Sequence, residues 1–206
     1  MNKILKDTLA LTAITVVLGA ALGIVHEVTL KPIAVQEQLT KEKAYAEVFS
    51  SAESFENIDL TKDGMNDKIL AALTEQGYDQ ETVDEAARAL DDDGTELGYV
   101  LTVTTSEGYG GDIQFTLGVT DEFEMQGISF LSISETAGLG MRADTDDFRE
   151  QFKDRTTSHI TYSKTGAASD DEIDALSGAT ITTNAVTNGV NAGLCAVNIL
   201  MEGGAQ

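Results

Sequence analysis

The sequence predicts an α+β protein in which a single N-terminal transmembrane helix precedes a domain with a mostly antiparallel sheet flanked by helices. Three observations support this prediction. Residues 8–25 contain no charged side chain, as expected of a membrane-spanning helix. Three segments rich in β-branched and aromatic residues follow one another between residues 98 and 134, with short turn signals between them. Residues 182–202 place apolar side chains on one face at helical spacing.

Composition argues against several classes of function. The 206 residues include 13 Lys and Arg against 35 Asp and Glu, which gives a formal charge of −22. Nucleic-acid binding requires clustered basic side chains, so we expect no nucleic-acid partner. The one cysteine, Cys195, excludes an internal disulfide, a thiolate-bound iron–sulfur cluster and a zinc finger. With only two histidines as well, no metal site is expected.

Residues 1–31 are nearly neutral and are predicted to form a cytoplasmic tail and a membrane anchor. The remaining residues, 32–206, carry a net charge of −23. A helix over residues 8–25 is about 27 Å long, close to the roughly 30 Å of a bilayer's hydrocarbon core. A cleaved signal peptide is the alternative, but its apolar region usually runs only about 7 to 15 residues. Lys3 and Lys6 favour a cytoplasmic N-terminus, which places the bulk of the chain outside the cell membrane.

Residues 32–95 are expected to form a helical and irregular acidic segment that packs on the domain. Within it, residues 35–49 are predicted to be a helix that leaves the membrane, and residues 51–81 are predicted to be irregular. Residues 82–90 are predicted to be a short helix, because acidic side chains in a first turn suit the helix dipole. Residues 91–94 (DDDG) are predicted to be a turn, because they lack the ligand spacing of a calcium-binding loop.

Residues 96–206 are expected to form the core domain, which ends in a C-terminal helix. Cys195 lies beside the apolar stripe of that helix and is expected to be a small buried residue. The predicted elements are strands at 98–105, 112–119 and 125–134, a short charged helix at 144–152, and the C-terminal helix at 182–202.

Three short segments contain residues that suit a ligand site. The first, residues 174–180 (DALSGAT), directly precedes the C-terminal helix. The free backbone N–H groups and the dipole of a helix start attract phosphate, and Ser177, Thr180, Thr182 and Thr183 add hydroxyl donors. Helix capping without any ligand explains the same residues, and the residues alone favour it.

The other two segments are rich in glycine. In residues 134–140 (SETAGLG), Gly138 and Gly140 allow a positive φ or a close backbone approach to a flat ligand. Residues 107–111 (EGYGG) join the first two predicted strands, and Tyr109 can either stack on a ring or cap the sheet. In isolation, a glycine loop and a hairpin turn are the simpler interpretations.

Together, the three segments resemble the motifs of the FMN-binding domain family and occur in that family's order. DALSGAT resembles its flavinylation motif, SETAGLG its Glu-Thr-Pro-Gly-Leu-Gly loop, and GYGG its central glycine turn. The single short N-terminal span makes the chain similar to the G subunits of Rnf ion-translocating electron transport complexes. The C subunits of sodium-pumping NADH:quinone reductases share the motifs but are usually longer, so the resemblance favours the G subunits.

The resemblance implies covalent FMN, attached to Thr180 by a phosphoester bond that a separate flavin transferase installs. Ala137 stands where the family commonly has Pro, which leaves this loop less rigid. Neither a catalytic residue nor a metal ligand is implied. The other implied cofactor-binding residues are Asp174, Ser177, Gly178 and Ala179 on the phosphate side, and Tyr109, Glu135, Thr136, Gly138 and Leu139 on the side of the isoalloxazine ring.

The implied function is electron relay through FMN, in a membrane-anchored subunit of an ion-translocating ferredoxin:NAD⁺ oxidoreductase of the cell membrane. No independent catalysis is expected, because the redox chemistry belongs to the flavin. The implied partners are the other membrane subunits of the complex, the flavin transferase, and membrane lipid around residues 8–25. Two alternatives stay open: the FMN-bearing C subunit of a sodium-translocating NADH:quinone reductase, and a flavin-free, membrane-tethered acidic binding module.

Overall fold

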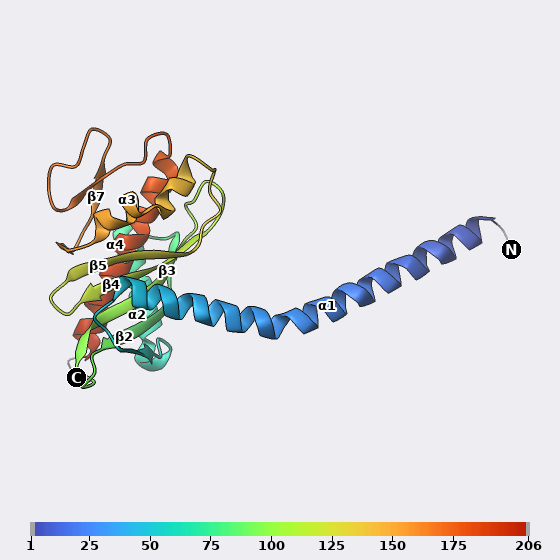
Figure 1. Cartoon of the computed structure of the whole chain (residues 1–206), viewed down its shortest axis with the longest axis horizontal. Coiled ribbons are helices and arrows are strands. Elements are labelled where there is room, and N and C mark those ends of the chain that lie inside the picture. Colours follow the sequence, from blue (N-terminus) through green and yellow to red (C-terminus); the bar gives the residue numbers. More distant parts are fainter. Residues whose placement is uncertain (1–2, 205–206) are drawn as a thin grey trace. The chain divides into compact units, whose positions relative to one another are not determined.

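The computed structural model describes residues 3–204 and divides the chain into two compact units, residues 1–42 and 43–206. Residues 1–2 of the predicted tail and residues 205–206 of the predicted core lie outside the described residues. Helix α1 (Lys3–Val48) extends across this division: residues 3–42 of the helix belong to the first unit, and residues 43–48 belong to the second (Figure 1).

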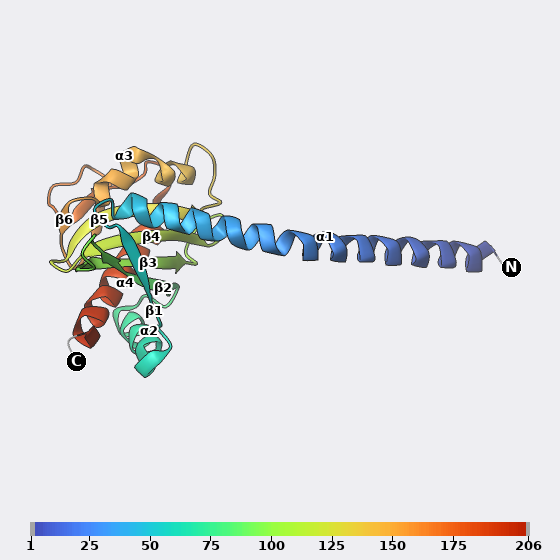
Figure 2. The ribbon, with the colours of Figure 1, turned by 60° about the horizontal axis from the view of Figure 1, so that its bottom comes forward.

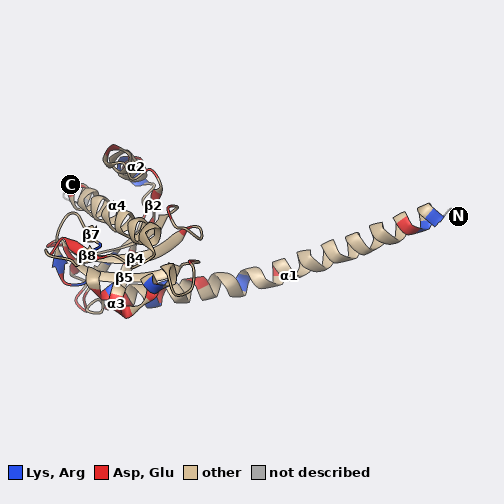
Figure 3. Cartoon of the chain, turned by 90° about the horizontal axis from the view of Figure 1, so that it is seen from above, with Lys and Arg blue, Asp and Glu red and all other residues tan. Residues whose placement is uncertain are grey.

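Helix α1 is continuous through Pro32, so the predicted helix at 35–49 is the last part of α1 and not a separate element. In the described part of the chain, α1 is the one helix long and apolar enough to cross a membrane. An 18-residue window of it has a mean hydropathy of 2.3 and is not buried by protein. Its charged residues lie at its N-terminal end and along its second half, with a long uncharged stretch between them (Figure 3). Thr8, Thr12 and Thr15 donate their hydroxyls to carbonyls four residues earlier, so these groups are satisfied within the helix.

The second unit is built on an antiparallel sheet, which confirms the predicted α+β fold. Six strands pair in the order β1-β2-β3-β4-β5-β6, and two short strands, β7 and β8, form a separate parallel pair. The strands are β1 (Ser54–Ile58), β2 (Glu81–Leu90), β3 (Glu96–Thr105), β4 (Ile113–Thr120), β5 (Glu124–Ser132), β6 (Arg155–Thr156), β7 (Thr161–Ser163) and β8 (Glu172–Asp174). The helices are α2 (Met65–Gln76), α3 (Asp146–Arg149) and α4 (Thr180–Gly204), with 3₁₀ turns at Lys62–Gly64, Gly140–Asp144 and Glu150–Phe152.

The predicted helix at 82–90 is wrong, because this segment is strand β2. Strand β2 pairs with β1 on one side and with β3 on the other, so tertiary pairing overrides the helical propensity of its Glu, Ala and Arg residues. Residues 51–81 were predicted to be irregular, but they contain β1 and α2. Helix α2 buries only Ile69 and Leu73, which leaves too weak an apolar pattern for prediction from sequence.

Both faces of the sheet are covered. Helices α2 and α4 pack against each other on one face, over the larger hydrophobic cluster (Figure 2). Residues 45–49 cover the other face, where Tyr45, Val48 and Phe49 form a smaller cluster with β2 and β3. The neighbouring pairs Ala86–Leu101 and Ala87–Val100 lie in different clusters, because successive side chains of a strand point to opposite faces.

The end of α1 approaches the sheet closely at a pair of glycines. Gly118 of β4 pairs with Gly127 of β5. A Cβ atom on Gly118 would lie 2.8 Å from the carbonyl oxygen of Val48, so a side chain there would displace the end of α1. Polar contacts hold the same region: the Ser129 hydroxyl donates to Glu47 Oε2 over 2.7 Å.

Helix α4 lies against the sheet through two glycines of its own. A Cβ atom on Gly189 would lie 2.9 Å from the buried ring of Phe115, and one on Gly193 would lie 2.7 Å from Leu117 Cδ2. Glycine lowers helix propensity, yet here it permits a short distance between helix and sheet. That distance sets the position of Thr180, the first residue of α4.

We expect Gly189→Ala to destabilise the protein. The overpacked methyl group costs about 1–3 kcal/mol, more than the about 1 kcal/mol gained in helix propensity. Chemical denaturation of the full chain in detergent measures the free energy of unfolding. Gly203→Ala is the matched control, since its methyl group meets only the end of the flexible Met65 side chain. If Gly189→Ala were as stable as Gly203→Ala, the packing explanation would be wrong.

Glu81 is a buried carboxyl group, 2% exposed, that accepts a hydrogen bond from the Thr105 hydroxyl over 3.0 Å. Burial raises the pKa of Glu81, the Thr105 hydrogen bond partly offsets this shift, and the negative charges of Glu107 and Asp79 add to it. Protonated Glu81 therefore contributes to the free energy of unfolding. This contribution is fully present below the pKa that Glu81 has in the unfolded chain, and it is lost as pH rises through the higher pKa of Glu81 in the folded chain.

We therefore expect Glu81→Gln to raise the free energy of unfolding at neutral pH, because the amide cannot ionise and its oxygen still accepts from Thr105. The decline of stability from about pH 4 upward should also become smaller. Urea titrations across this pH range measure both effects. Glu122→Gln, at an exposed turn, is the control. An unchanged pH profile in Glu81→Gln would show that Glu81 is ionised at no energetic cost.

Candidate functional site

The three glycine- and hydroxyl-containing segments meet around one cavity of about 480 Å³, a size typical of small-molecule sites. All three segments contribute to its wall although they lie far apart in the sequence. The lining residues are Tyr109, Glu135, Thr136, Leu139, Gly140, Gly178, Ala179, Thr180, Ile181 and Thr182.

The sheet brings the first two segments together. Strands β3 and β5 both pair antiparallel with β4, so they run in the same direction and their C-terminal ends lie at the same end of the sheet. The turn after β3 and the loop after β5 therefore lie side by side (Figure 1). The Gly110 N–H donates to Glu135 Oε1 over 3.0 Å and joins them.

The buried carboxylate of Glu135 connects all three segments. Its Oε2 atom accepts a hydrogen bond from the Thr182 hydroxyl over 2.9 Å, while Oε1 accepts from Gly110. The family resemblance implies that Glu135 lies near the ring of a flavin. Its contacts give it a structural role as well, because each oxygen holds a neighbouring segment of the cavity wall.

Two glycines make this arrangement possible. A Cβ atom on Gly140 would overlap the Glu135 carboxylate and the Thr182 hydroxyl, so only glycine fits there. Gly178 has a φ of +79°, in the left-handed region that favours glycine, and a Cβ atom there would lie 3.2 Å from Leu139 Cδ2. At Gly140 and Gly178, the backbone thus leaves space beside the cavity that the side chain of a larger residue would fill.

At the start of α4, some hydrogen-bonding groups have protein partners and others have none among residues 3–204. The Thr183 hydroxyl donates to the Ala179 carbonyl oxygen over 3.0 Å and accepts the Leu176 N–H over 3.1 Å, so it stabilises the loop before the helix. Within residues 3–204, the Thr180 hydroxyl and the backbone N–H groups of residues 180–182 donate to no protein group. Donors of this kind at a helix start can bind a phosphate.

Three predicted site residues do not line the cavity. Asp174 Oδ1 accepts the Ala167 N–H over 2.6 Å, so this carboxylate holds the loop between β7 and β8. Ser177 is exposed outside the lining, and Gly138 lies between the lining residues Thr136 and Leu139. The other seven predicted residues line the cavity.

The structure adds residues that sequence analysis did not place in the site. Ile181, which directly follows Thr180, lines the cavity. Gly140 and Thr182 line it as well, and the sequence had already suggested the first for close backbone approach and the second as a hydroxyl donor. Arg142 brings a cation to the same region: its guanidinium lies 3.5 Å from the Ser177 carbonyl oxygen. The only sequence signal for Arg142 is its place two residues after the SETAGLG segment.

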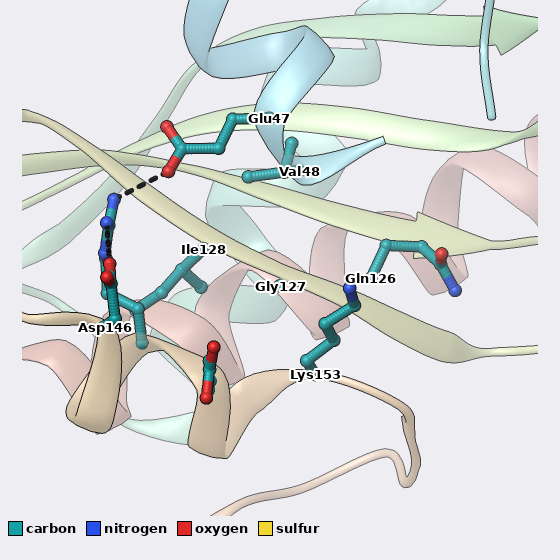
Figure 4. Close-up of a pocket in the computed structure, with 9 residues that line it drawn as sticks. Glu47, Val48, Gln126, Gly127, Ile128, Asp146 and Lys153 are labelled. Carbon is teal, nitrogen blue, oxygen red and sulfur yellow. Dashed lines mark hydrogen bonds and ion pairs between the residues drawn. The ribbon is translucent and has the colours of Figure 1, made fainter. Parts of the chain in front are cut away.

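A smaller cavity, of about 170 Å³, lies among the end of α1, strand β5 and helix α3 (Figure 4). Arg149 beside it donates to Glu47 Oε1 over 2.9 Å and to Asp146 Oδ1 over 2.6 Å. These carboxylates raise the pKa of Arg149, against the opposing effect of burial, which is the largest single influence. This cavity contains none of the three segments, and its ion pairs join residues of the second unit, from the last turn of α1 to α3.

No group of three or more His, Cys, Asp or Glu residues that could hold a metal ion occurs among residues 3–204.

Comparisons with known proteins show what the chain is similar to. The profile of the FMN-binding domain matches residues 108–194, which include every residue that lines the larger cavity. The G subunit of the proton-translocating ferredoxin:NAD(+) oxidoreductase complex of Clostridium ljungdahlii is 42% identical over 94 residues, which cover 46% of this chain and 50% of that protein. The chain thus spans half the length of this relative.

Two further matches cover most of the chain. The G subunit of the Na(+)-translocating ferredoxin:NAD(+) oxidoreductase complex of Acetobacterium woodii is 28% identical over 190 residues, which cover 91% of this chain and 88% of that protein. The crystal structure of the C subunit of the Na(+)-translocating NADH-quinone reductase from Parabacteroides distasonis has the same fold, with a TM-score of 0.58 at 16% identity over 84% of this chain and 96% of that one. Residues 108–194 therefore match the FMN-binding domain, and the chain is similar to the G subunits of ion-translocating ferredoxin:NAD(+) oxidoreductase complexes.

Proposed function

We propose that this chain is a membrane-anchored FMN subunit that relays electrons in an ion-translocating ferredoxin:NAD⁺ oxidoreductase complex of the Rnf type. One observation carries the proposal: the match to the FMN-binding domain contains the whole lining of the larger cavity. The names of the relatives and the apolar helix α1 support a place in a membrane complex.

The residues of the cavity fit FMN. Bound FMN supplies the ability to accept and pass on electrons, while the protein supplies position and electrostatics. The free N–H groups at the start of α4 and the nearby Arg142 suit the phosphate. Tyr109, Leu139 and Ile181 are exposed apolar side chains of the wall, and they offer surfaces to a flat ring.

We further propose that the flavin is attached to the Thr180 hydroxyl through a phosphoester bond. Of the hydroxyls near the start of α4, that of Thr182 donates to Glu135 and that of Thr183 is used to cap the preceding loop. Ser177 lies outside the lining. Thr180 lines the cavity, is exposed, and has a hydroxyl that donates to no group within residues 3–204, so a flavin transferase could reach it.

We also propose how the chain is placed at the membrane. Residues 1–31 form the cytoplasmic tail and the anchor, with lipid around residues 8–25. Residues 32–95 lead to and support the domain, and residues 96–206 form the FMN-binding core on the extracytoplasmic side. The partners are the other membrane subunits of the complex and, during maturation, the flavin transferase. The protein relays electrons and has no independent catalytic activity.

The covalent link can be tested with flavin fluorescence. In cells that possess the transferase, the denatured wild-type chain should give a fluorescent band on a gel, because a phosphoester survives denaturation. Thr180→Val should abolish the band, and Thr165→Val, at an exposed loop outside the cavity, should leave it unchanged. A colourless wild type would refute the covalent link, whereas a fluorescent Thr180→Val variant would refute only the attachment site.

The side of the membrane can be tested with protease. Protease added to intact spheroplasts should degrade residues 43–204 and leave the N-terminal tail protected, because the proposed orientation exposes only the domain. Immunodetection of tags at the two termini measures this, with a cytoplasmic protein as the control for leakage. Degradation of the domain only after lysis would reverse the orientation.

A further inference from the structure

The turn that carries Tyr109 has little rigidity of its own. Residues 108–111 include three glycines, and glycine allows many backbone conformations. Tyr109 is 71% exposed, so core packing does not fix its position. The position of this side chain against the cavity must therefore depend on contacts on either side of it.

One such contact lies before Tyr109. Glu107 Oε2 accepts two hydrogen bonds from α4: from Asn188 Nδ2 over 2.7 Å and from Asn184 Nδ2 over 3.0 Å. These asparagines are one helical turn apart, four and eight residues after Thr180. The Glu107 N–H also donates to the Thr105 hydroxyl over 3.3 Å, which ties the turn to the end of β3.

The second contact lies after Tyr109. The Gly110 N–H donates to Glu135, whose other oxygen accepts from Thr182 of α4. Two carboxylates, one on each side of Tyr109, therefore connect the turn to the first turns of a single helix. Sequence analysis included Glu135 in the site but not Glu107, whose partners lie 77 and 81 residues away.

Glu107 is well suited to such a role. The carboxylate is half-buried, and within residues 3–204 it forms no ion pair with a basic side chain, so the two amide groups are its side-chain partners. Hydrogen bonds to a charged acceptor are stronger than neutral ones. Loss of this carboxylate would release one end of the glycine turn and leave Glu135 as its remaining connection to α4.

We propose that Glu107 is a positioning residue of the flavin site: through Asn184 and Asn188 it fixes the turn that holds Tyr109 against the isoalloxazine ring. This inference rests on the proposed function, which places FMN in the cavity. Glu107 touches no reacting atom and acts only through the turn.

The test uses the full-length flavin-loaded protein and measures the fluorescence yield and anisotropy of the bound FMN. Tyr109→Leu should raise the yield, because it removes an aromatic ring that quenches the flavin. Glu107→Ala should produce most of the same rise and lower the anisotropy, and the double variant should change little beyond Tyr109→Leu alone. Glu107→Gln should resemble the wild type, because its amide oxygen can accept from both asparagines. Glu122→Ala is the exposed matched control.

Asn188→Ala provides a second way to release the turn, should Glu107→Ala fail to fold, and it should also raise the yield. The inference is overturned if Asn188→Ala or a folded Glu107→Ala matches the wild type in both measurements. It is also overturned if the effects of Glu107→Ala and Tyr109→Leu simply add. A wild-type chain without flavin overturns the proposed function and this inference with it, whereas a flavin-loaded chain that is insensitive to these variants overturns the inference alone.

Discussion

The larger cavity depends on a single buried carboxylate. Glu135 accepts one hydrogen bond from the turn after β3 and another from the first turn of α4, while its own backbone belongs to the loop after β5. Burying a carboxylate whose oxygens lack hydrogen-bond partners costs free energy. The hydrogen bonds from Gly110 and Thr182 therefore stabilise the buried Glu135 side chain. Gly140 is required beside it, since any side chain there would occupy the space of the carboxylate. These contacts join the segments that form the cavity wall.

The sheet provides the support for that carboxylate. Its two faces are covered by different parts of the chain: α2 and α4 on one, and residues 45–49 on the other. At both faces, glycines permit a short distance between helix and sheet, at Gly118 for the end of α1 and at Gly189 for α4. The start of α4 is thereby held at the end of the sheet where β3 and β5 terminate.

Hydroxyl groups near the start of α4 have separate roles that their sequence does not distinguish. Thr182 holds Glu135, Thr183 caps the loop before the helix, and Thr180 faces the cavity without a protein partner among the described residues. Capping, which the residues alone favour, and phosphate binding therefore do not exclude each other. Thr183 suits capping and Thr180 suits phosphate binding, although both lie in one short segment.

Elements with strong local patterns could be predicted from the amino-acid sequence. The uncharged run predicted the apolar part of α1, the β-branched segments predicted β3 to β5, and the helical stripe predicted α4. The three motifs predicted most of the cavity lining, because each motif is short and contiguous.

The remaining features could not be predicted in this way, because they depend on partners that are distant in the sequence. Strand β2 has helical propensity and becomes a strand through pairing on both sides. Asp174 belongs to the motif, yet it holds a different loop. Glu107 gained its role from two asparagines about eighty residues away, a relation that no local pattern shows.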